Sequence, residues 1–200
     1  FFAPGVTVQP GMLIRNLTPT KNVVLQNFLL RGVNSTALAP ATPALTLRDN
    51  VSHVRVQACE LIGGKGASNA NPNGVQAVDA LNCLSTALVG CLVYGGAGQS
   101  SPNLGFKAGN GGPGIVTSAG QLMIYESTTF GGAGGGSNVG GWSPGGAGGT
   151  AIEHATGTLF VASSGSIGGH GGISFVGGAG GNGLSMGASG LAWLFGSTPT

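Results

Sequence analysis

Charged side chains are scarce in this chain of 200 residues. Seven Lys or Arg and five Asp or Glu make up 6% of the sequence, against about 25% in an ordinary globular protein. The formal net charge is +2, and all seven basic residues lie before residue 108 without clustering. Nucleic-acid-binding proteins need clustered Lys and Arg, so we expect no nucleic-acid partner. The low charge also argues against disorder driven by charge repulsion.

Other class-defining features are missing as well. Three cysteines are too few for a disulfide framework. No apolar run reaches the length of about 18 residues that a membrane-spanning helix needs, so no membrane span is expected. No segment sustains apolar residues at helical spacing, which predicts little helix. The sequence begins with Phe1 rather than Met and shows no secretory signal, so we expect a mature form or a fragment of a longer protein.

Glycine is abundant instead, with 42 residues. Each ordered glycine costs about 0.5–1 kcal/mol relative to alanine, so ordering all of them would cost tens of kcal/mol. Most of them fall in four tracts, 63–74, 95–114, 131–149 and 168–183, and a fifth excursion, 33–43, is rich in Ala, Pro and Thr. The tracts are therefore either disordered tethers or segments whose close backbone packing offsets the cost.

Between the tracts the sequence repeats. Each repeat has a short apolar block, a turn, a second apolar block and a glycine exit. The six repeats span residues 12–32, 44–64, 75–96, 114–132, 150–169 and 183–200. Apolar residues alternate within the second block, as in Val54-Arg55-Val56 and Leu122-Met123-Ile124, which is the periodicity of a β-strand.

Three columns of like residues support this alignment. The first column, of small residues, contains Asn27, Cys59, Cys91, Ser127, Ser164 and Ser197. The second, before the glycine exit, contains Leu30, Ile62, Tyr94, Phe130 and Ile167. The third, at the end of the first block, contains Asn16, Asp49, Asp79, Ser118 and His154. Coils of strands stacked about 4.8 Å apart would place each residue beside its counterparts.

The sequence therefore predicts an all-β fold, a parallel β-helix of about six coils with the glycine-rich excursions leaving from one corner. We expect one domain over residues 1–200, with 1–11 as an N-terminal lead-in. The excursions are expected to pack backbone to backbone, in part as polyproline II. Packing is favoured over floating loops because apolar residues lie inside the excursions: Leu104, Phe106, Trp142, Ile173 and Phe175.

The blocks "NVVLQNFLLRG", "HVRVQACELIGG" and "LSTALVGCLVYGG" have the strand, small residue, apolar residue and glycine order typical of one fold family. In this respect residues 11–200 resemble the right-handed parallel β-helix proteins of the pectin-lyase-like superfamily, in a glycine-rich variety. The resemblance, together with the general crossover rule, implies a right-handed coil. A bacterial protein that is extracellular or at the cell surface fits this style of fold.

Asp49 and Asp79 are the acids most suggestive of chemistry. In the alignment they share a column on adjacent coils, with carboxylates about 5 Å apart and Arg48 beside them. Such a pair could act as general acid and nucleophile in glycoside cleavage or hold a calcium ion. The resemblance adds that relatives which cleave acidic polysaccharides use carboxylates and Arg on a strand face. The favoured alternative is that both acids form turns, so no catalytic residue is assigned.

Other motifs offer no site. His53, His154 and His170 lack metal-ligand spacing, "GGKGAS" (63–68) lacks phosphate-loop spacing, and "GGAGGNGLS" (177–185) resembles a calcium-binding nonapeptide with Asn in place of the Asp ligand. No metal or cofactor is therefore expected. Cys59 and Cys91 stack on adjacent coils, either as a disulfide or as free buried thiols, and Cys83 has no obvious partner.

These observations favour a non-catalytic structural protein, an extracellular or cell-surface scaffold. The open ends of a solenoid are unpaired strand edges, so end-to-end or lateral self-association into fibres is expected. The alternative is a β-helix that binds or cleaves polysaccharide with Asp49, Asp79 and Arg48 at its centre, and carbohydrate is then the partner.

Overall fold

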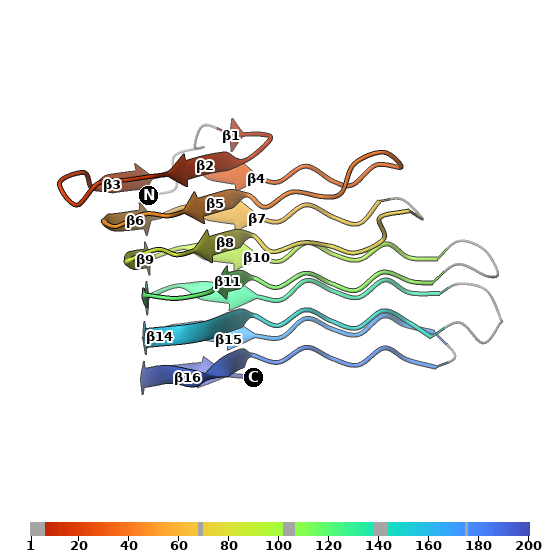
Figure 1. The fold of residues 1–200 in the computed structure, drawn as a ribbon. Helices are drawn as coiled ribbons and strands as arrows, with labels where there is room; N and C mark the ends of the chain where they lie inside the picture. The colour runs from red at the N-terminus through yellow and green to blue at the C-terminus, as the bar shows by residue number, and fades with distance from the viewer. Residues whose placement is uncertain (1–6, 68–69, 102–106, 138–143, 175) are drawn as a thin grey trace.

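The computed structural model describes residues 7–67, 70–101, 107–137, 144–174 and 176–200. Over these residues the chain forms β-strands and no helix, and the strands stack as a β-solenoid of about five turns (Figure 1). The predicted all-β parallel solenoid is thus confirmed. Within the described part of the chain, no helix is long and apolar enough to cross a membrane.

The strands form two parallel sheets. A seven-stranded sheet contains β1 (Thr7–Val8), β4 (Leu29–Arg31), β7 (Glu60–Ile62), β10 (Leu92–Tyr94), β13 (Thr128–Phe130), β15 (Gly165–Ile167) and β17 (Thr198–Pro199). The other sheet has two rows. The first blocks of the repeats supply β2 (Met12–Arg15), β5 (Leu45–Arg48), β8 (Val78–Leu81) and β11 (Ile115–Thr117). The second blocks supply β3 (Val23–Gln26), β6 (His53–Gln57), β9 (Ser85–Val89) and β12 (Gln121–Tyr125). The rows merge in the long strands β14 (Ile152–Ala162) and β16 (Leu184–Phe195).

The core lies between these sheets and follows the alternation of the sequence. Val54 and Val56 on β6 are buried while Arg55 between them is exposed. Val56 lies beside Leu88 in the next coil, and both are fully buried. Each such side chain contributes about 1.5–3 kcal/mol of burial free energy, which is how a coil that cannot fold alone is stabilised by its neighbours.

A left-handed residue ends the second block of every coil. The six residues at this turn have φ between 49° and 60°: Asn27, Ala58, Gly90, Glu126, Ser163 and Gly196. Because this backbone conformation redirects the chain, the strand of the second block stops there and the short strand of the seven-stranded sheet begins two residues later.

This turn corrects the predicted columns in the first coil. Leu29 pairs with Glu60, so Phe28 and not Asn27 lies beside Cys59, while Asn27 occupies the left-handed position. The same one-residue shift affects the second column. Arg31, and not the predicted Leu30, lies beside Ile62. In the later coils the first two columns are as predicted: Cys59, Cys91, Ser127, Ser164 and Ser197, and Ile62, Tyr94, Phe130 and Ile167.

The glycine-rich excursions leave one corner as stacked pairs of extended segments (Figure 1). We call the segments outgoing and returning arms. The outgoing arms are 32–36, 63–67, 95–101, 131–137 and 168–174, and the returning arms are 39–44, 70–77, 107–114, 144–151 and 176–183. The predicted backbone packing is confirmed for these residues. Ile173 is 87% exposed, so it does not anchor its arm. Leu104, Phe106, Trp142 and Phe175 lie outside the described residues.

Backbone hydrogen bonds between the arms repeat every three residues. In the fourth outgoing arm, the N–H groups of Gly134 and Ser137 donate to the next outgoing arm over 2.8–2.9 Å, and that of Gly131 donates to the end of β15, directly before that arm, over 2.9 Å. The N–H groups of Gly132 and Gly135 donate to the returning arm of the preceding coil over 2.8 Å. A three-residue period without bonds inside the segment is that of polyproline II. The arms thus form one hydrogen-bonded body, which we call the glycine array.

Candidate functional site

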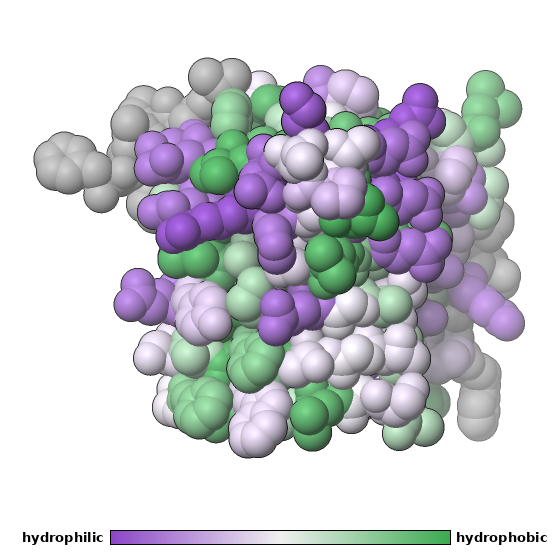
Figure 2. All heavy atoms as spheres, turned by 60° about the vertical axis from the view of Figure 1, so that its left-hand side comes forward, coloured by the Kyte–Doolittle hydropathy of each residue, from purple (hydrophilic) through white to green (hydrophobic). Residues whose placement is uncertain are grey.

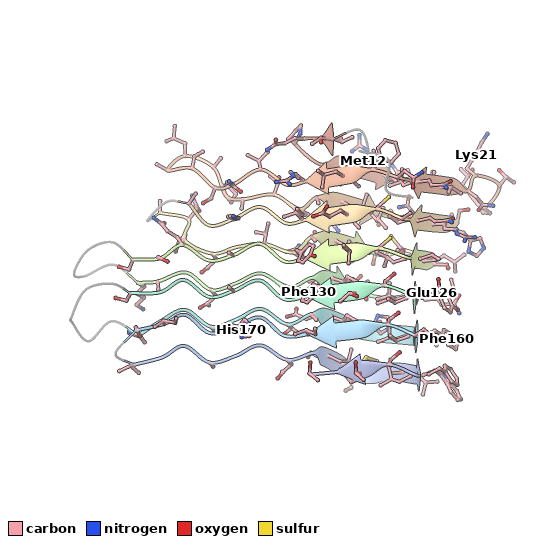
Figure 3. The ribbon with its side chains drawn as sticks, turned by 180° about the vertical axis from the view of Figure 1, so that it is seen from behind. Met12, Lys21, Glu126, Phe130, Phe160 and His170 are labelled. Atoms are coloured by element: carbon pink, nitrogen blue, oxygen red, sulfur yellow. The ribbon has the colours of Figure 1, made fainter. Side chains whose placement is uncertain are left out.

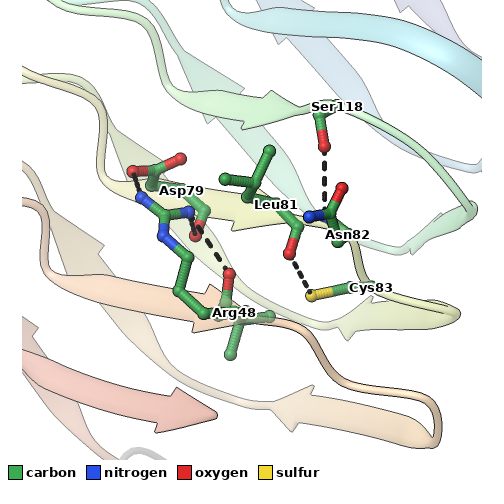
Figure 4. A network of polar contacts seen from close by, with 7 residues as sticks. Arg48, Asp79, Leu81, Asn82, Cys83 and Ser118 are labelled. Carbon is green, nitrogen blue, oxygen red and sulfur yellow. Dashed lines mark hydrogen bonds and ion pairs between the residues drawn. The ribbon is translucent and has the colours of Figure 1, made fainter. Parts of the chain in front are cut away.

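Arg48 and Asp79 form an ion pair on the outer side of β5 and β8 (Figure 4). Arg48 Nη2 donates to Asp79 Oδ2 over 2.5 Å, and Nη1 donates to the backbone carbonyl of Leu47 over 3.3 Å. The side chains of Arg48 and Asp79 are 30% and 18% exposed. The hydrogen bond to the Asp79 carboxylate raises the pKa of Arg48, against the opposing effect of partial burial.

Asp49 does not share a column with Asp79, and this prediction is wrong. Arg48 pairs with Leu81, so Asp49 lies opposite Asn82, while Asp79 pairs with Thr46 three positions earlier. Asn82 Nδ2 donates to Asp49 Oδ1 over 3.0 Å. The prediction ends the first block of this repeat at Asp79, whereas β8 continues to Leu81 and the turn follows at Asn82.

The two acids therefore have different roles. Asn16, Asp49 and Asn82 all have left-handed backbone, with φ of 57°, 51° and 55°, which agrees with the turn-forming interpretation of Asp49. Asp79 lies within a strand and is paired with Arg48. Catalysis by two adjacent carboxylates needs both side chains at one site, and the geometry does not provide that pair.

The histidines and other possible metal ligands also lie apart. His53 is exposed on β6, His154 is buried on β14, and His170 is exposed on the last outgoing arm. Across the described ranges, no three His, Cys, Asp or Glu side chains are grouped so that they could hold a metal ion.

The cysteines are free and buried. Cys59 and Cys91 lie on adjacent coils as predicted. Of the two predicted alternatives, a disulfide or free buried thiols, the structure has the free thiols. Burial raises the pKa of Cys91 to about 11 and also raises the pKa of Cys59. Cys83 lies at the other turn, where Asn50 Nδ2 is 3.8 Å from its sulfur. Their raised pKa values argue against nucleophilic chemistry, which needs a thiolate.

His154 is the most unusual polar side chain of the interior. It is 1% exposed, and its Nδ1 is 2.5 Å from the hydroxyl of Thr117 on the adjacent strand. Its Nε2 has no hydrogen-bond partner among the described residues. Burial lowers the pKa of His154. A shallow hollow beside it is lined in part by Glu153 and Met186. Sequence reasoning placed His154 at the end of a block, and the inward alternation of "IEHA" was the signal that it is buried.

The outer face of the second blocks carries aromatic side chains near the C-terminal end. Met123, Phe160 and Trp193 lie side by side on β12, β14 and β16. The rings of Phe160 and Trp193 stack at 6.4 Å with an interplanar angle of 11°, and Phe160 projects outward from the solenoid in Figure 3. Trp193 is 47% and Phe195 57% exposed.

This face divides into two regions. Hydrophilic side chains cover its N-terminal coils and hydrophobic ones gather over its C-terminal coils (Figure 2). Sequence reasoning missed the aromatic region. The signal was the position of Phe160 and Trp193 in "TLFVA" and "LAWLF", where each alternates with inward-facing residues.

In comparisons with protein-family models, with curated proteins and with solved structures, nothing matches this chain.

Proposed function

We propose that this chain is a non-catalytic structural protein, a rigid scaffold at the cell surface or outside the cell, of the glycine-rich variety of right-handed parallel β-helix proteins in the pectin-lyase-like superfamily. The observation that carries the proposal is the glycine array. Interlocked arms extend the hydrogen-bonded stack well beyond the apolar core, as a rigid element requires. A bacterial source fits the same style of fold.

Self-association through the ends of the solenoid is the second part of the proposal. β16 pairs with β14 on one side only within the described chain, and its sequence LSMGASGLAWLF has no charged residue and no proline. Proteins that keep such an edge monomeric usually protect it with charge or proline. Leu194 pairs with the buried Val161 but is itself 44% exposed, as expected of a core residue that a further coil would cover.

Sedimentation velocity and electron microscopy of the purified protein test this proposal. We expect concentration-dependent assemblies or filaments, and Leu194→Lys should reduce them because it places a charge on the stacking surface. Trp193→Lys is the matched control, because it adds the same charge at the neighbouring residue, whose side chain faces outward. It should leave end-to-end stacking intact. A protein that stays monomeric at every concentration would contradict the proposal.

Polysaccharide binding is a second candidate, favoured by the exposed aromatic region of Phe160, Trp193 and Phe195. Flat aromatic side chains offer large contact area at low entropic cost, which suits a sugar ring. Titration with polygalacturonate and with a neutral glucan tests it. Saturable quenching of Trp fluorescence that Trp193→Ala abolishes would support binding, whereas no change with either polymer would exclude these ligands. Cleavage has no support from the positions of Asp49 and Asp79.

A further inference from the structure

The last returning arm carries two glycines for which packing within the described chain gives no reason. A Cβ atom added at Gly177 would have no heavy atom within 4 Å, and one added at Gly180 would meet only the carbonyl oxygen of Gly169, at 3.8 Å. Glycine costs about 0.5–1 kcal/mol relative to alanine when it is ordered. At these two positions no contact with the described residues offsets that cost.

In earlier coils the same position is tightly covered. A Cβ atom at Gly148 would lie 1.9 Å from the carbonyl oxygen of Gly169, and one at Gly111 would lie 1.9 Å from that of Gly132. In both cases the covering atom belongs to the outgoing arm of the next coil. The position is therefore glycine because an arm lies directly over it. At Gly177 and Gly180 the glycine is present, but no arm of the described chain covers it.

The cover begins at the base of the same arm. A Cβ atom at Gly183, three residues beyond Gly180, would meet the backbone nitrogen and oxygen of Thr200 at 2.7 and 2.6 Å. Thr200 also accepts a hydrogen bond from the N–H of Gly168 over 2.9 Å. Thr200 thus covers the first position of this row, and Gly180 and Gly177 follow directly outward from it.

Backbone groups on both sides of this opening lack the partners that their counterparts have. The N–H of Gly134 donates to the carbonyl of His170 over 2.8 Å, but the N–H of its counterpart Gly171 has no partner within the described ranges. On the returning side, the carbonyl of Gly146 accepts from the N–H of Gly172 over 2.7 Å. Gly178 occupies the same position as Gly146, one coil later.

The carbonyls of Gly178 and Gly181 accept no hydrogen bond from the described residues. The opening therefore has free donors along one wall, free acceptors along the other and bare glycine between them. Since donors and acceptors each recur every three residues, the complementary molecule has the same period.

We propose that the groove between the last outgoing arm (168–174) and the last returning arm (176–183) binds an extended peptide segment with glycine at every third residue. The segment lies where a further outgoing arm would lie. Its carbonyls accept from the N–H of Gly171, and its N–H groups donate to the carbonyls of Gly178 and Gly181. The proposal does not depend on the scaffold function or on fibre formation.

Steric contact specifies the glycine. The segment occupies the place that Gly172 occupies one coil earlier, where an added Cβ atom would lie 1.9 Å from the carbonyl oxygen of Gly135. A side chain at this position of the segment would collide with the backbone of the last outgoing arm. An ordinary extended peptide therefore cannot approach closely enough to form the hydrogen bonds.

Nuclear magnetic resonance of the labelled protein tests this inference. The probe is a capped synthetic peptide of three Gly-Gly-Ala repeats, and the control peptide of equal length has Ala-Ser-Ala repeats, which contain no glycine. We expect the first peptide to cause saturable shifts of the amide signals of Gly171, Gly177 and Gly180, and the control peptide to cause none. No saturable shift with the first peptide, or equal shifts with both, would overturn the proposal.

Two variants locate the site. Gly180→Val places its side chain in open space, so the fold is retained, but it fills the groove and should weaken peptide binding at least tenfold. Ala179→Val adds similar bulk at an exposed neighbouring position and should leave binding unchanged. Equal binding by both variants would overturn the assignment.

The same spectra distinguish a second copy of the chain as the occupant. If the signals of Gly177 and Gly180 depend on protein concentration without peptide, and Gly180→Val removes that dependence, a second copy fills the groove and the proposal of a separate glycine-rich segment is wrong. Filament formation that Leu194→Lys abolishes would still support the scaffold function in that case, because the two tests use different surfaces.

Discussion

The hydroxyl of Ser127 accepts a hydrogen bond from the backbone N–H of Cys91 in the neighbouring coil, over 3.0 Å. The same hydroxyl donates to the carbonyl of Tyr125, two residues earlier in its own coil, over 2.8 Å. Ser164 repeats the arrangement toward the N–H of Ser127, over 3.1 Å. The residue after each left-handed turn therefore connects that turn to the one beside it, at a point where the strand hydrogen bonds are interrupted.

Replacing Ser127 by Ala should destabilise the protein by about 1–3 kcal/mol, because it leaves the buried N–H of Cys91 without an acceptor. Ser127→Cys is the matched control and should cost less, since a thiol already accepts at this position where the N–H of Phe28 meets Cys59 Sγ at 3.4 Å. Chemical unfolding monitored by circular dichroism gives the comparison. Equal stability of the two variants would contradict this role of the hydroxyl.

The three thiols should resist modification in the folded protein. Burial raises the pKa of Cys91 to about 11 and raises those of Cys59 and Cys83, and only the thiolate reacts readily with a disulfide reagent. At pH 8 we expect no rapid reaction of the native protein with an aromatic disulfide, and reaction of all three thiols after denaturation. A reductant should not change the melting temperature, and a shift would indicate a disulfide between Cys59 and Cys91.

The glycine array predicts opposite outcomes for one substitution at two equivalent positions. Gly148→Ala should destabilise the protein by about 1–3 kcal/mol, because the new Cβ atom would overlap the backbone of the neighbouring arm. Gly180→Ala should be close to neutral or slightly stabilising, since its methyl group enters open space and alanine restricts the unfolded chain. Thermal unfolding of the two variants checks this, and similar losses would show that the last layer is already covered.

The sequence predicted the fold because its signals are local and repeated. Apolar alternation is visible in the strands, and the column of Cys and Ser residues is visible in each coil from Cys59 onward, so the stacking order followed from their alignment. The first coil was misaligned by one residue because Asn27 resembles the small polar members of that column. Its left-handed backbone, and not its polarity, is what places it one position earlier.

The candidate site was less predictable because it depends on where each strand of the first blocks ends. β8 continues past Asp79 to Leu81, and this shift of three residues separates Asp49 from Asp79 and places Asp79 beside Arg48 instead. The stacked rings of Phe160 and Trp193 also depend on strand register, because alternate residues of a strand face opposite sides. Neither relation follows from composition, since each needs the strand ends to be known.

The Arg48–Asp79 ion pair should contribute little to stability. Asp79→Asn is expected to lower the unfolding free energy by at most about 1 kcal/mol, because the pair is partly exposed and screened by solvent. A double-mutant cycle with Arg48→Gln isolates the interaction. A coupling energy well above that value would show that the pair has a larger structural role than its exposure indicates.

His154 should make stability depend on pH. Burial lowers its pKa in the folded protein below the usual 6.5, so above pH 6.5 the side chain is neutral in both states and its full contribution is present. Below pH 6.5 the unfolded chain binds the proton first, and the unfolding free energy falls until the pH drops below the folded pKa. Proton uptake by the unfolded state thus favours unfolding under mildly acidic conditions.

His154→Gln removes this titration while keeping a polar side chain beside Thr117. Between pH 7.5 and 5.5 we expect the wild-type protein to lose on the order of 1 kcal/mol more stability than the variant. All the other residues are the same in both proteins, so the difference between the two stability changes isolates His154. Parallel losses in the two proteins would mean that His154 accepts a proton without unfolding, with its Nε2 reaching solvent through the hollow beside Glu153 and Met186.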